Sequence, residues 1–329
     1  MQTPYDAPAV PSHIEARKQM LRGRDAEFAA LRRLDTHKRL CEFAVFIAIG
    51  GTGMALNYAG PALTSGWLAL VLRIVGTLAT ALMFNAFVLL MHEGMHGILV
   101  GRTSVNRWVS VALGATFFMS FTSYRVLHQH HHRYLGDRLD PDDYANYVNN
   151  RVAVWLMQYM RLLFGTYVYL VAIPLSALRR SSRADRIYIV QEYALLAALY
   201  TAVVLWMPHD AFLALWLYPL LITGYMTAVR GLSQHGVTDA QDPFLASRTI
   251  LPGRLVALIM LNENYHLEHH LFPEIPSYHL PQVYRLIDPR LPRRVTDSSY
   301  LGFLLRFFKA SLTLDESPIG LQTRPAVTA

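Results

Sequence analysis

The sequence predicts an all-α integral membrane protein with four transmembrane helices in two hairpins and a cytoplasmic helical cap that holds a metal site. Two observations predict this fold class. The 329 residues are 53% hydrophobic and only 16% charged, whereas an average soluble domain is about 25% charged. In addition, nine of the fourteen histidines fall in three five-residue windows, and histidine is a common metal ligand.

Composition also excludes several classes of protein. The single cysteine, Cys41, rules out an intramolecular disulfide framework, an iron–sulfur cluster and a four-thiolate iron site on this chain. The net charge of +7 does not indicate nucleic-acid binding, because the arginines flank apolar stretches and are not interleaved with stacking aromatics.

Residues 1–40 are predicted to be a cytoplasmic tail followed by an interfacial helix. The chain begins with Pro4, Pro8 and Pro11 and lacks the pattern of a signal peptide. Residues 15–39 are compatible with a helix and rich in arginine and lysine, as expected of a helix that lies on a membrane surface.

Two apolar stretches, residues 42–58 and 67–91, predict the first hairpin. A bilayer core about 30 Å thick needs roughly 20 helical residues. The second stretch is therefore long enough, and the first is short. The connecting residues 57–66 carry no charge and contain a Gly-Pro turn, so we expect a tight turn there.

The next two apolar stretches are not predicted to span. Residues 108–121 are too few and suit a re-entrant or in-plane helix. Residues 152–178 are interrupted by Arg161, Gly165 and Pro174, and we expect an interfacial helix with aromatic side chains at headgroup depth. The second hairpin then comprises residues 187–207 and 211–229.

The distribution of basic residues predicts the topology. Two hairpins place both termini and the three histidine windows on one side of the membrane. Eight arginines and lysines precede residue 40, and the two outer loops contain none, so the positive-inside rule makes that side cytoplasmic. Residues 291–329 are expected to form a cytoplasmic C-terminal segment that is disordered after Leu314.

The histidine windows have the spacing of helical metal ligands. They are His92-Glu-Gly-Met-His96, His128-Gln-His-His-His132 and His266-Leu-Glu-His-His270. Residues at i, i+3 and i+4 share a helix face, so the windows supply two, three and three converging imidazoles. Eight nitrogen ligands are too many for one metal ion and suit two.

Three other interpretations explain less of this pattern. His92, Glu93 and His96 match the HExxH motif of zinc proteases, but such an enzyme needs only one further ligand. The histidines could instead be structural, bonded to backbone carbonyls at the interface. They could also line the pathway of a zinc or proton transporter, although a transporter would place them within the spans and not at their ends.

The order and spacing of HxxxH, HxxHH and HxxHH resemble the integral-membrane fatty acid desaturase family, which includes hydroxylases and ketolases. The stretch from Asn262 to Pro281 is similar to that family's third box and its Phe-Pro-x-x-Pro tail. Residues that flank the second box also fit, namely Tyr124-Arg125, Leu135-Gly136 and Asp140-Pro141-Asp142. The resemblance covers roughly residues 40–290 and implies a desaturase-like catalytic domain over residues 41–290.

The resemblance implies nine metal ligands, of which the ninth, His235, lies just past the fourth span. They are His92, His96, His128, His131, His132, His235, His266, His269 and His270. His130 lies off the shared helix face, and we expect it to be exposed or behind the ligands. His279, His13, His37 and His209 are assigned no chemistry.

Carboxylates near the boxes are candidates for orienting the ligands, because a metal-bound imidazole usually donates its other N–H to a carboxylate or carbonyl. Asp140 is the first candidate, since the resemblance includes its Asp-Pro pair. The others are Asp142, Glu93, Glu263 and Glu268, and each could equally be a solvated charge. Arg125 and Arg230 could pair with these carboxylates or with a substrate headgroup.

The resemblance implies an O2-dependent membrane oxidase with two iron ions and O2 as co-substrate, acting as a fatty acid (acyl-lipid) desaturase. The alternative within the family is a lipid or carotenoid hydroxylase or ketolase. The sequence has no His-Pro-Gly-Gly signature of a fused cytochrome b5. We therefore expect electrons from a separate ferredoxin, rubredoxin or cytochrome b5 with its reductase. Arginines that suit an acidic donor are Arg179, Arg180, Arg183, Arg186, Arg285, Arg290, Arg293 and Arg294.

Overall fold

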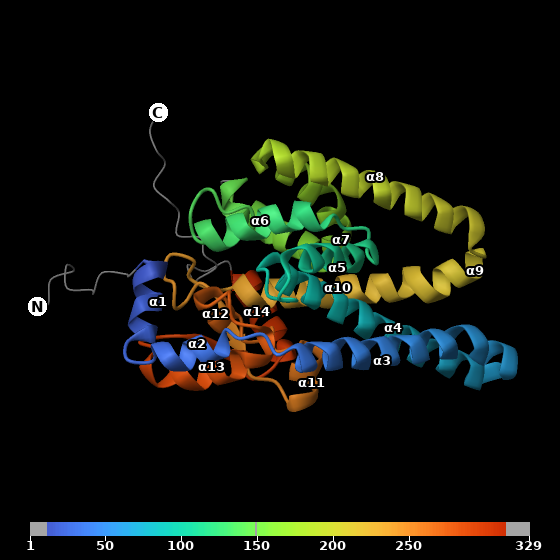
Figure 1. Cartoon of the computed structure of the whole chain (residues 1–329), viewed down its shortest axis with the longest axis horizontal. Coiled ribbons are helices and arrows are strands. Elements are labelled where there is room, and N and C mark those ends of the chain that lie inside the picture. Colours follow the sequence, from blue (N-terminus) through green and yellow to red (C-terminus); the bar gives the residue numbers. More distant parts are fainter. Residues whose placement is uncertain (1–11, 149, 314–329) are drawn as a thin grey trace, which may run out of the picture.

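The computed structural model describes residues 12–148 and 150–313, and helices dominate this part of the chain (Figure 1). Four of its helical segments are long and apolar enough to cross a membrane: α3 (Thr36–Leu63), α4 (Gly66–Met95), α8 (Arg183–Trp206) and His209–His235. The last segment combines α9 (His209–Phe212), the π-helical turn η2 (Leu213–Leu217) and α10 (Tyr218–His235). The four predicted spans are thus all present as helices.

Shorter elements lie before, between and after these segments. In the first half of the chain they are α1 (His13–Leu21), α2 (Asp25–Leu31), α5 (Thr103–Ala115), α6 (Phe121–Tyr134), η1 (Tyr144–Asn146) and α7 (Arg151–Arg180). In the second half they are β1 (Arg248–Ile250), α11 (Arg254–Ile259), α12 (His266–Leu271), η3 (Ser277–His279), α13 (Leu280–Ile287), η4 (Asp288–Arg290), β2 (Val295–Asp297) and α14 (Tyr300–Thr313). Strands β1 and β2 pair in parallel.

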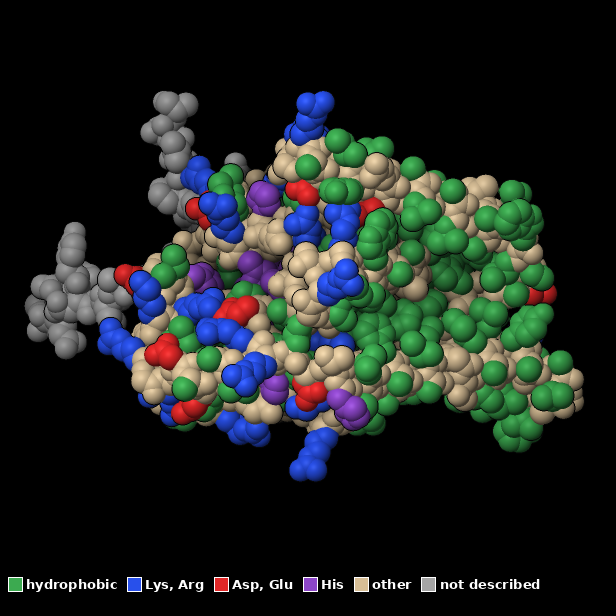
Figure 2. Space-filling model, in the orientation of Figure 1, with side chains coloured by type: hydrophobic (Ala, Val, Ile, Leu, Met, Phe, Trp, Pro, Cys, Tyr) green, Lys and Arg blue, Asp and Glu red, His purple; other side chains and the backbone are tan. Residues whose placement is uncertain are grey.

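Charged and apolar side chains occupy opposite ends of the molecule (Figure 2). Arginine, lysine and the acidic residues gather at the end that contains α1, α2, α12 and α13 (Figures 1 and 2). At the other end large hydrophobic side chains are exposed, among them Leu70, Val204 and Trp206. An exposed apolar surface of this extent suits contact with the hydrocarbon of a bilayer, where helices satisfy their own backbone hydrogen bonds.

The link between α3 and α4 is shorter than predicted. We expected a turn over residues 57–66, but α3 continues through Gly60 and Pro61 to Leu63. Pro61 has no N–H to donate to the preceding turn, and the helix ends two residues after it. The prediction that the first span is short is therefore wrong, since α3 has 28 residues.

Small residues bring α3 and α4 into close contact. A Cβ atom built on Gly53 would lie 2.7 Å from the carbonyl oxygen of Gly76, so the two backbones touch. Close approach through small residues is typical of membrane helices. At the far end of this pair, Asn57 Nδ2 donates to the Oγ1 atom of Thr77 (2.7 Å) and to the carbonyl of Ala214 (2.9 Å), which joins α3, α4 and η2.

Helix α8 diverges from α10 and is anchored elsewhere. The two helices meet only near α9 and separate towards the charged end (Figure 1). The buried carboxylate of Glu192 on α8 accepts hydrogen bonds from Ser120 Oγ (2.7 Å) and from the backbone and hydroxyl of Thr122 (2.9 and 2.6 Å). It also pairs with Arg107 of α5 at 3.1 Å. Glu192 therefore fixes the start of α6, which carries the second histidine window.

The two apolar stretches that were not predicted to span form α5 and α7. With 13 residues, α5 is too short to cross a bilayer. Helix α7 is bent by 114° between its halves, Val152–Gly165 and Leu170–Arg180. The expected interfacial position of α7 stays a prediction.

The N-terminal helices pack on the segment that follows the third histidine window. Met20 and Phe28 share a hydrophobic cluster with Phe272 of that segment, and Arg17 and Arg32 both pair with Glu274. The predicted contact of residues 15–39 with a membrane surface stays a prediction. The predicted disordered end after Leu314 lies outside the described residues.

Candidate metal centre

Four helix ends bring the predicted ligands together. His92 lies in the last turn of α4, which His96 caps. Helix α6 carries the second window, α12 carries the third, and His235 is the last residue of α10. The N-cap of α6 is Ser120, whose hydroxyl accepts the N–H of Ser123 and donates to Glu192. The second window is therefore positioned both by its own cap and by α8.

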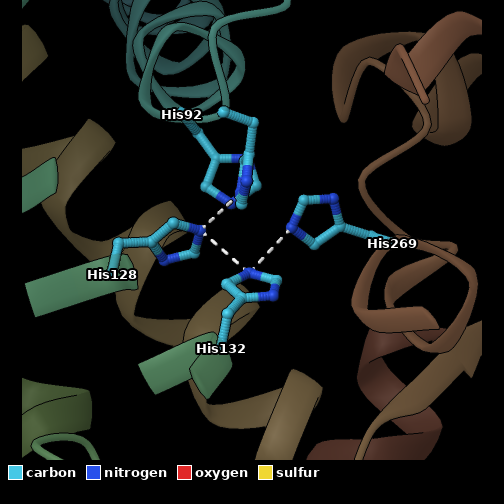
Figure 3. Close-up of side chains that lie close together, drawn as sticks. His92, His128, His132 and His269 are labelled. Atoms are coloured by element: carbon cyan, nitrogen blue, oxygen red, sulfur yellow. Dashed lines mark hydrogen bonds between the residues drawn. The ribbon is translucent and has the colours of Figure 1, made fainter. Parts of the chain in front are cut away.

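Five histidines form the first group, and one ring nitrogen of each lies within 4.8 Å of the others. Its members are His92, His96, His128, His132 and His269. The Nε2 atom of His128 lies 2.9 Å from that of His96 and 3.0 Å from that of His132. The Nε2 atoms of His132 and His269 are 3.1 Å apart. Figure 3 shows His92, His128, His132 and His269 arranged around a common centre.

The second group lies beside the first and contains His131, His235 and His270, again within 4.8 Å of one another. His266 belongs to it by distance, because its Nε2 atom lies 3.0 Å from that of His235 and 3.1 Å from that of His270. The Nε2 atoms of His131 and His235 are 3.2 Å apart. The structure thus brings all nine predicted ligands into two adjacent groups of five and four.

The spacing within both groups fits a metal ion. Two nitrogens that each lie about 2.1 Å from one metal ion, at 90° to each other, are about 3.0 Å apart. The Nε2 atoms converge at 2.9–3.2 Å. Hydrogen bonds alone do not explain this arrangement, because a neutral imidazole has only one donor and one acceptor nitrogen. Both groups are therefore suited to hold a metal ion.

The second and third windows each contribute to both groups. In the second window the i and i+4 residues, His128 and His132, belong to the first group and the i+3 residue, His131, to the second. In the third window the order is reversed, since His269 joins the first group and His270 the second. Two short helices therefore bridge both sites and fix the distance between them.

Burial keeps most of these imidazoles neutral, which is the form that binds a metal. Removal from water lowers the pKa of the ligands outside the spanning helices well below the usual value; they are His96, His128, His132, His266, His269 and His270. His131 is different. Burial lowers its pKa, but the neighbouring carboxylates of Asp140 and Asp142 raise it above the usual value.

Two buried carboxylates face the outer nitrogens of ligands. Asp140 Oδ1 lies 2.9 Å from His131 Nδ1, while Asp142 Oδ2 is 4.0 Å from the same atom and half-exposed. Glu263 Oε1 lies 3.3 Å from His92 Nδ1, and neither oxygen of Glu263 has a hydrogen-bond partner among the described residues. Asp140 and Glu263 thus occupy the positions from which a carboxylate orients a metal-bound imidazole.

Glu93 and Glu268 have partners other than the predicted histidines. Successive helical residues point about 100° apart, so Glu93 turns away from His92. Its carboxylate pairs with Arg39 and accepts the N–H of Ser277 at 2.9 Å. Glu268 accepts the hydroxyl of Thr249 at 2.7 Å, and burial raises its pKa to about 7. Because Glu93 is engaged in an ion pair away from the histidines, it is not placed as the general base of a HExxH protease.

The remaining candidates lie outside the two groups. His130 lies one position off the helix face that carries His128, His131 and His132, and its Nδ1 atom donates to the carbonyl of Val126 at 2.8 Å. His279 lies in η3. Arg125 pairs with Asp185 at 2.6 Å and not with the carboxylates near the boxes. Sequence reasoning did not single out the pairing of Arg39 with Glu93 or of Glu192 with Thr122, because these partners lie 54 and 70 residues apart along the chain.

A cavity leads to the histidines from the apolar half of the molecule. It encloses about 970 Å³, including the open space at its mouth. His92, His128, His131, His235 and His266 line one part of it. Most of its remaining wall area is apolar, with Phe117, Met119, Ile173 and Leu220 among the lining residues. Polar and charged side chains also line it: Asp142, Arg161, Thr223, Thr227, Arg230, Gln234 and Glu263. The apolar part of the lining suits an apolar molecule that lies beside the histidines.

Fold and site together define an integral membrane protein with two adjacent histidine groups that could each hold a metal ion. The chain belongs to the fatty acid desaturase family, whose model matches residues 65–300. This match confirms the resemblance seen in the histidine boxes.

Individual relatives are sphingolipid enzymes of vertebrates. The chain is 28% identical over 220 residues to the Homo sapiens sphingolipid delta(4)-desaturase/C4-monooxygenase DES2. It is 27% identical over 212 residues to the Gallus gallus sphingolipid delta(4)-desaturase DES1. Each alignment covers 61% of this chain, and the chain spans about 61% of the length of these relatives.

Proposed function

We propose that this chain is an O2-dependent membrane di-iron oxidase that inserts a double bond into the acyl chain of a lipid. The observation that carries the proposal is the pair of histidine groups, five and four, in the wall of a mainly apolar cavity. Membership of the fatty acid desaturase family supports the reaction type, and the apolar cavity supports a lipid substrate.

Iron fits the nine-imidazole donor set. One ion would be held by His92, His96, His128, His132 and His269, and the other by His131, His235, His266 and His270. Bound iron supplies the activation of O2 that breaks an unactivated C–H bond, which no side-chain acid or base can do. Burial keeps most of the imidazoles neutral, Asp140 and Glu263 orient His131 and His92, and the cavity walls keep water away from the reacting carbon.

Hydroxylation is the second candidate reaction. Desaturation and hydroxylation both begin with removal of one hydrogen and differ only in the step that follows, so the ligand set does not distinguish them. The relative DES2 is named both as a desaturase and as a C4-monooxygenase, which supports keeping lipid hydroxylation, or ketolation, as the alternative outcome for this chain.

The topology and the electron donor are part of the same proposal. We place the charged end with its histidines in the cytoplasm, because eight arginines and lysines precede residue 40. Electrons come from a separate ferredoxin, rubredoxin or cytochrome b5 with its reductase. Exposed arginines such as Arg285 and Arg290 at that end attract an acidic donor. Turnover that is insensitive to added salt would contradict docking of the donor there.

The test is product analysis with purified, iron-loaded protein, an electron-donor system, O2 and isotopically labelled lipids. We expect a new double bond or hydroxyl group in one chain, and no product from His131→Ala or His270→Ala. His130→Ala is the matched control, because His130 adjoins His131 but lies outside both groups. Absence of any oxidised lipid from protein that holds its iron would contradict the proposal.

A further inference from the structure

A second cavity lies between α7 and α10 and encloses about 400 Å³, including the open space at its mouth. We call it the groove. Its described lining residues are leucines, glycines, one phenylalanine and one tyrosine. Apart from the hydroxyl of Tyr225, their side chains carry no polar group. The groove therefore suits hydrocarbon and offers no ion pair to a charged headgroup.

The groove adjoins the cavity that contains the histidines. The two spaces share three lining residues, Leu170, Leu220 and Gly224. With a rise of 1.5 Å per residue, Gly224 lies about 16.5 Å along the axis of α10 from His235. The two spaces therefore meet well away from this ligand. Phe117 and Met119 line the inner cavity but not the groove, so they mark the space beyond the junction.

The rim of the groove is exposed on the apolar surface of the molecule. The exposed fractions of Leu163, Phe164 and Tyr225 are 64%, 47% and 53%. Deeper in the groove, that of Leu220 is 7%. Tyr225 lies on His209–His235, one of the segments long and apolar enough to cross a membrane. Lipid chains that surround this segment therefore reach the mouth of the groove.

The bend of α7 leaves room for the groove, and a helix contact bounds it. Gly165 and Leu170, which flank the bend of 114°, both line the groove. Towards the histidines the two helices come together, because a Cβ atom built on Gly165 would lie 3.2 Å from the Cβ atom of Ala228. Ala228 is one helical turn beyond Gly224. The space between α7 and α10 is thus open at Gly224 and closed at Ala228.

We propose that a hydrocarbon chain of a bilayer lipid enters the cavity sideways, through the groove between α7 and α10. The inference rests on the proposed function, in which a lipid is the substrate, and adds the route by which the lipid arrives. An apolar passage suits a chain that moves from the bilayer into an apolar cavity, because no polar group has to leave water. Delivery from the water side is the alternative that the test separates.

Photolabelling in a bilayer tests the route without requiring turnover. The probe is phosphatidylcholine with a diazirine at the end of one acyl chain, mixed into bilayers that hold the purified protein and no electron donor. Mass spectrometry after irradiation maps the labelled residues. We expect label on the rim at Tyr225 and, beyond the junction, on Phe117 or Met119. Label confined to the rim would show that surrounding lipid does not enter, and would overturn the proposal.

Gly224→Leu places a side chain where the two spaces join. We expect the label on Phe117 and Met119 to fall roughly tenfold or more, because an overfilled space rejects the chain, while the rim stays labelled. The matched control is Gly51→Leu, the same change on a face of α3 where nothing lies within 4 Å, and it should label like the wild type. Unchanged inner label in Gly224→Leu would mean that lipid arrives by another route.

Phe164→Ala decides the question if Gly224→Leu does not fold. Phe164 is exposed at the rim, so its truncation should leave the Tm nearly unchanged, widen the groove and make the inner label appear sooner than in the wild type. An unchanged labelling rate would contradict the route. If Gly224→Leu blocks the inner label but iron-loaded wild-type protein oxidises no lipid, the proposed function fails and the route stands. Oxidation of bilayer lipid by Gly224→Leu at the wild-type rate would overturn the route and keep the function.

Discussion

His131 Nδ1 lies 2.9 Å from the Oδ1 atom of Asp140, and both residues are buried. Asp140 Oδ1 also accepts the backbone N–H of Asp142 at 2.9 Å, which holds the carboxylate in place. Because Nδ1 donates to Asp140, Nε2 of His131 is the free nitrogen, and it faces His235. Asp140 thus selects the tautomer in which His131 can bind a metal ion.

Asp140→Ala should weaken metal binding. Loss of a carboxylate that orients a ligand typically lowers metal affinity or activity about 10- to 100-fold. Titration of the metal-free protein with ferrous iron measures the change. Asp142→Ala is the control, because Asp142 lies 4.0 Å from the same nitrogen and is half-exposed. Equal losses in the two variants would contradict a specific role for Asp140.

Arg39 and Glu93 should behave as a structural pair. Their side chains are 4% and 2% exposed, and removing one partner from a buried ion pair costs about 3–5 kcal/mol. Arg39→Leu should therefore lower the Tm strongly. The double variant Arg39→Leu/Glu93→Leu should recover part of the loss, because Glu42 and the N–H of Ser277 still lack their partners. Thermal unfolding in detergent compares the three proteins. A Glu93→Gln variant that keeps its Tm but loses its enzymatic activity would instead favour the protease interpretation.

Glu192 should control the stability of the second histidine window. Glu192→Leu leaves the donors of Ser120, Thr122 and Arg107 without their acceptor. We expect a loss of about 3–5 kcal/mol together with a lower iron content, although Glu192 contacts no histidine. Glu192→Gln, which keeps an acceptor oxygen, should lose less. Full iron content in a destabilised Glu192→Leu protein would show that α6 is held by other contacts.

Two neighbouring glycines of α3 should respond in opposite ways to alanine. At Gly53 a Cβ atom would meet the backbone of α4 at 2.7–2.8 Å, whereas at Gly51 nothing lies within 4 Å. Gly53→Ala should cost about 1–3 kcal/mol through overpacking. Gly51→Ala should be neutral or stabilise by roughly 0.5–1 kcal/mol, since alanine favours the helix. Similar Tm values for the two variants would contradict the close contact of α3 with α4.

The spanning helices and the nine histidines that lie together could be predicted because their signals are local. Hydropathy over about twenty residues marks a spanning helix, and i, i+3 and i+4 spacing marks histidines on one helix face. It could not be predicted that His131 joins one group while His128 and His132 join the other, because this depends on how α6 faces α12. Only tertiary packing shows that Glu93 pairs with Arg39, which lies 54 residues earlier.

Helix boundaries show the same limit. The polar Arg230, Gln234 and His235 indicated an end of the fourth span at residue 229, yet α10 continues to His235. Contacts with the cavity and the metal centre tolerate polar side chains there that lipid would not. Gly60-Pro61 likewise indicated a turn, but packing against Leu72 of α4 keeps this segment helical.

The metal content of the purified, detergent-solubilised protein tests the central claim most directly. Two groups of five and four histidines predict about two iron ions per chain. His131→Ala should lose iron, and His130→Ala should keep it. One tightly bound zinc ion per chain, retained in His131→Ala, would contradict a paired iron centre and favour a mononuclear zinc site built on His92 and His96.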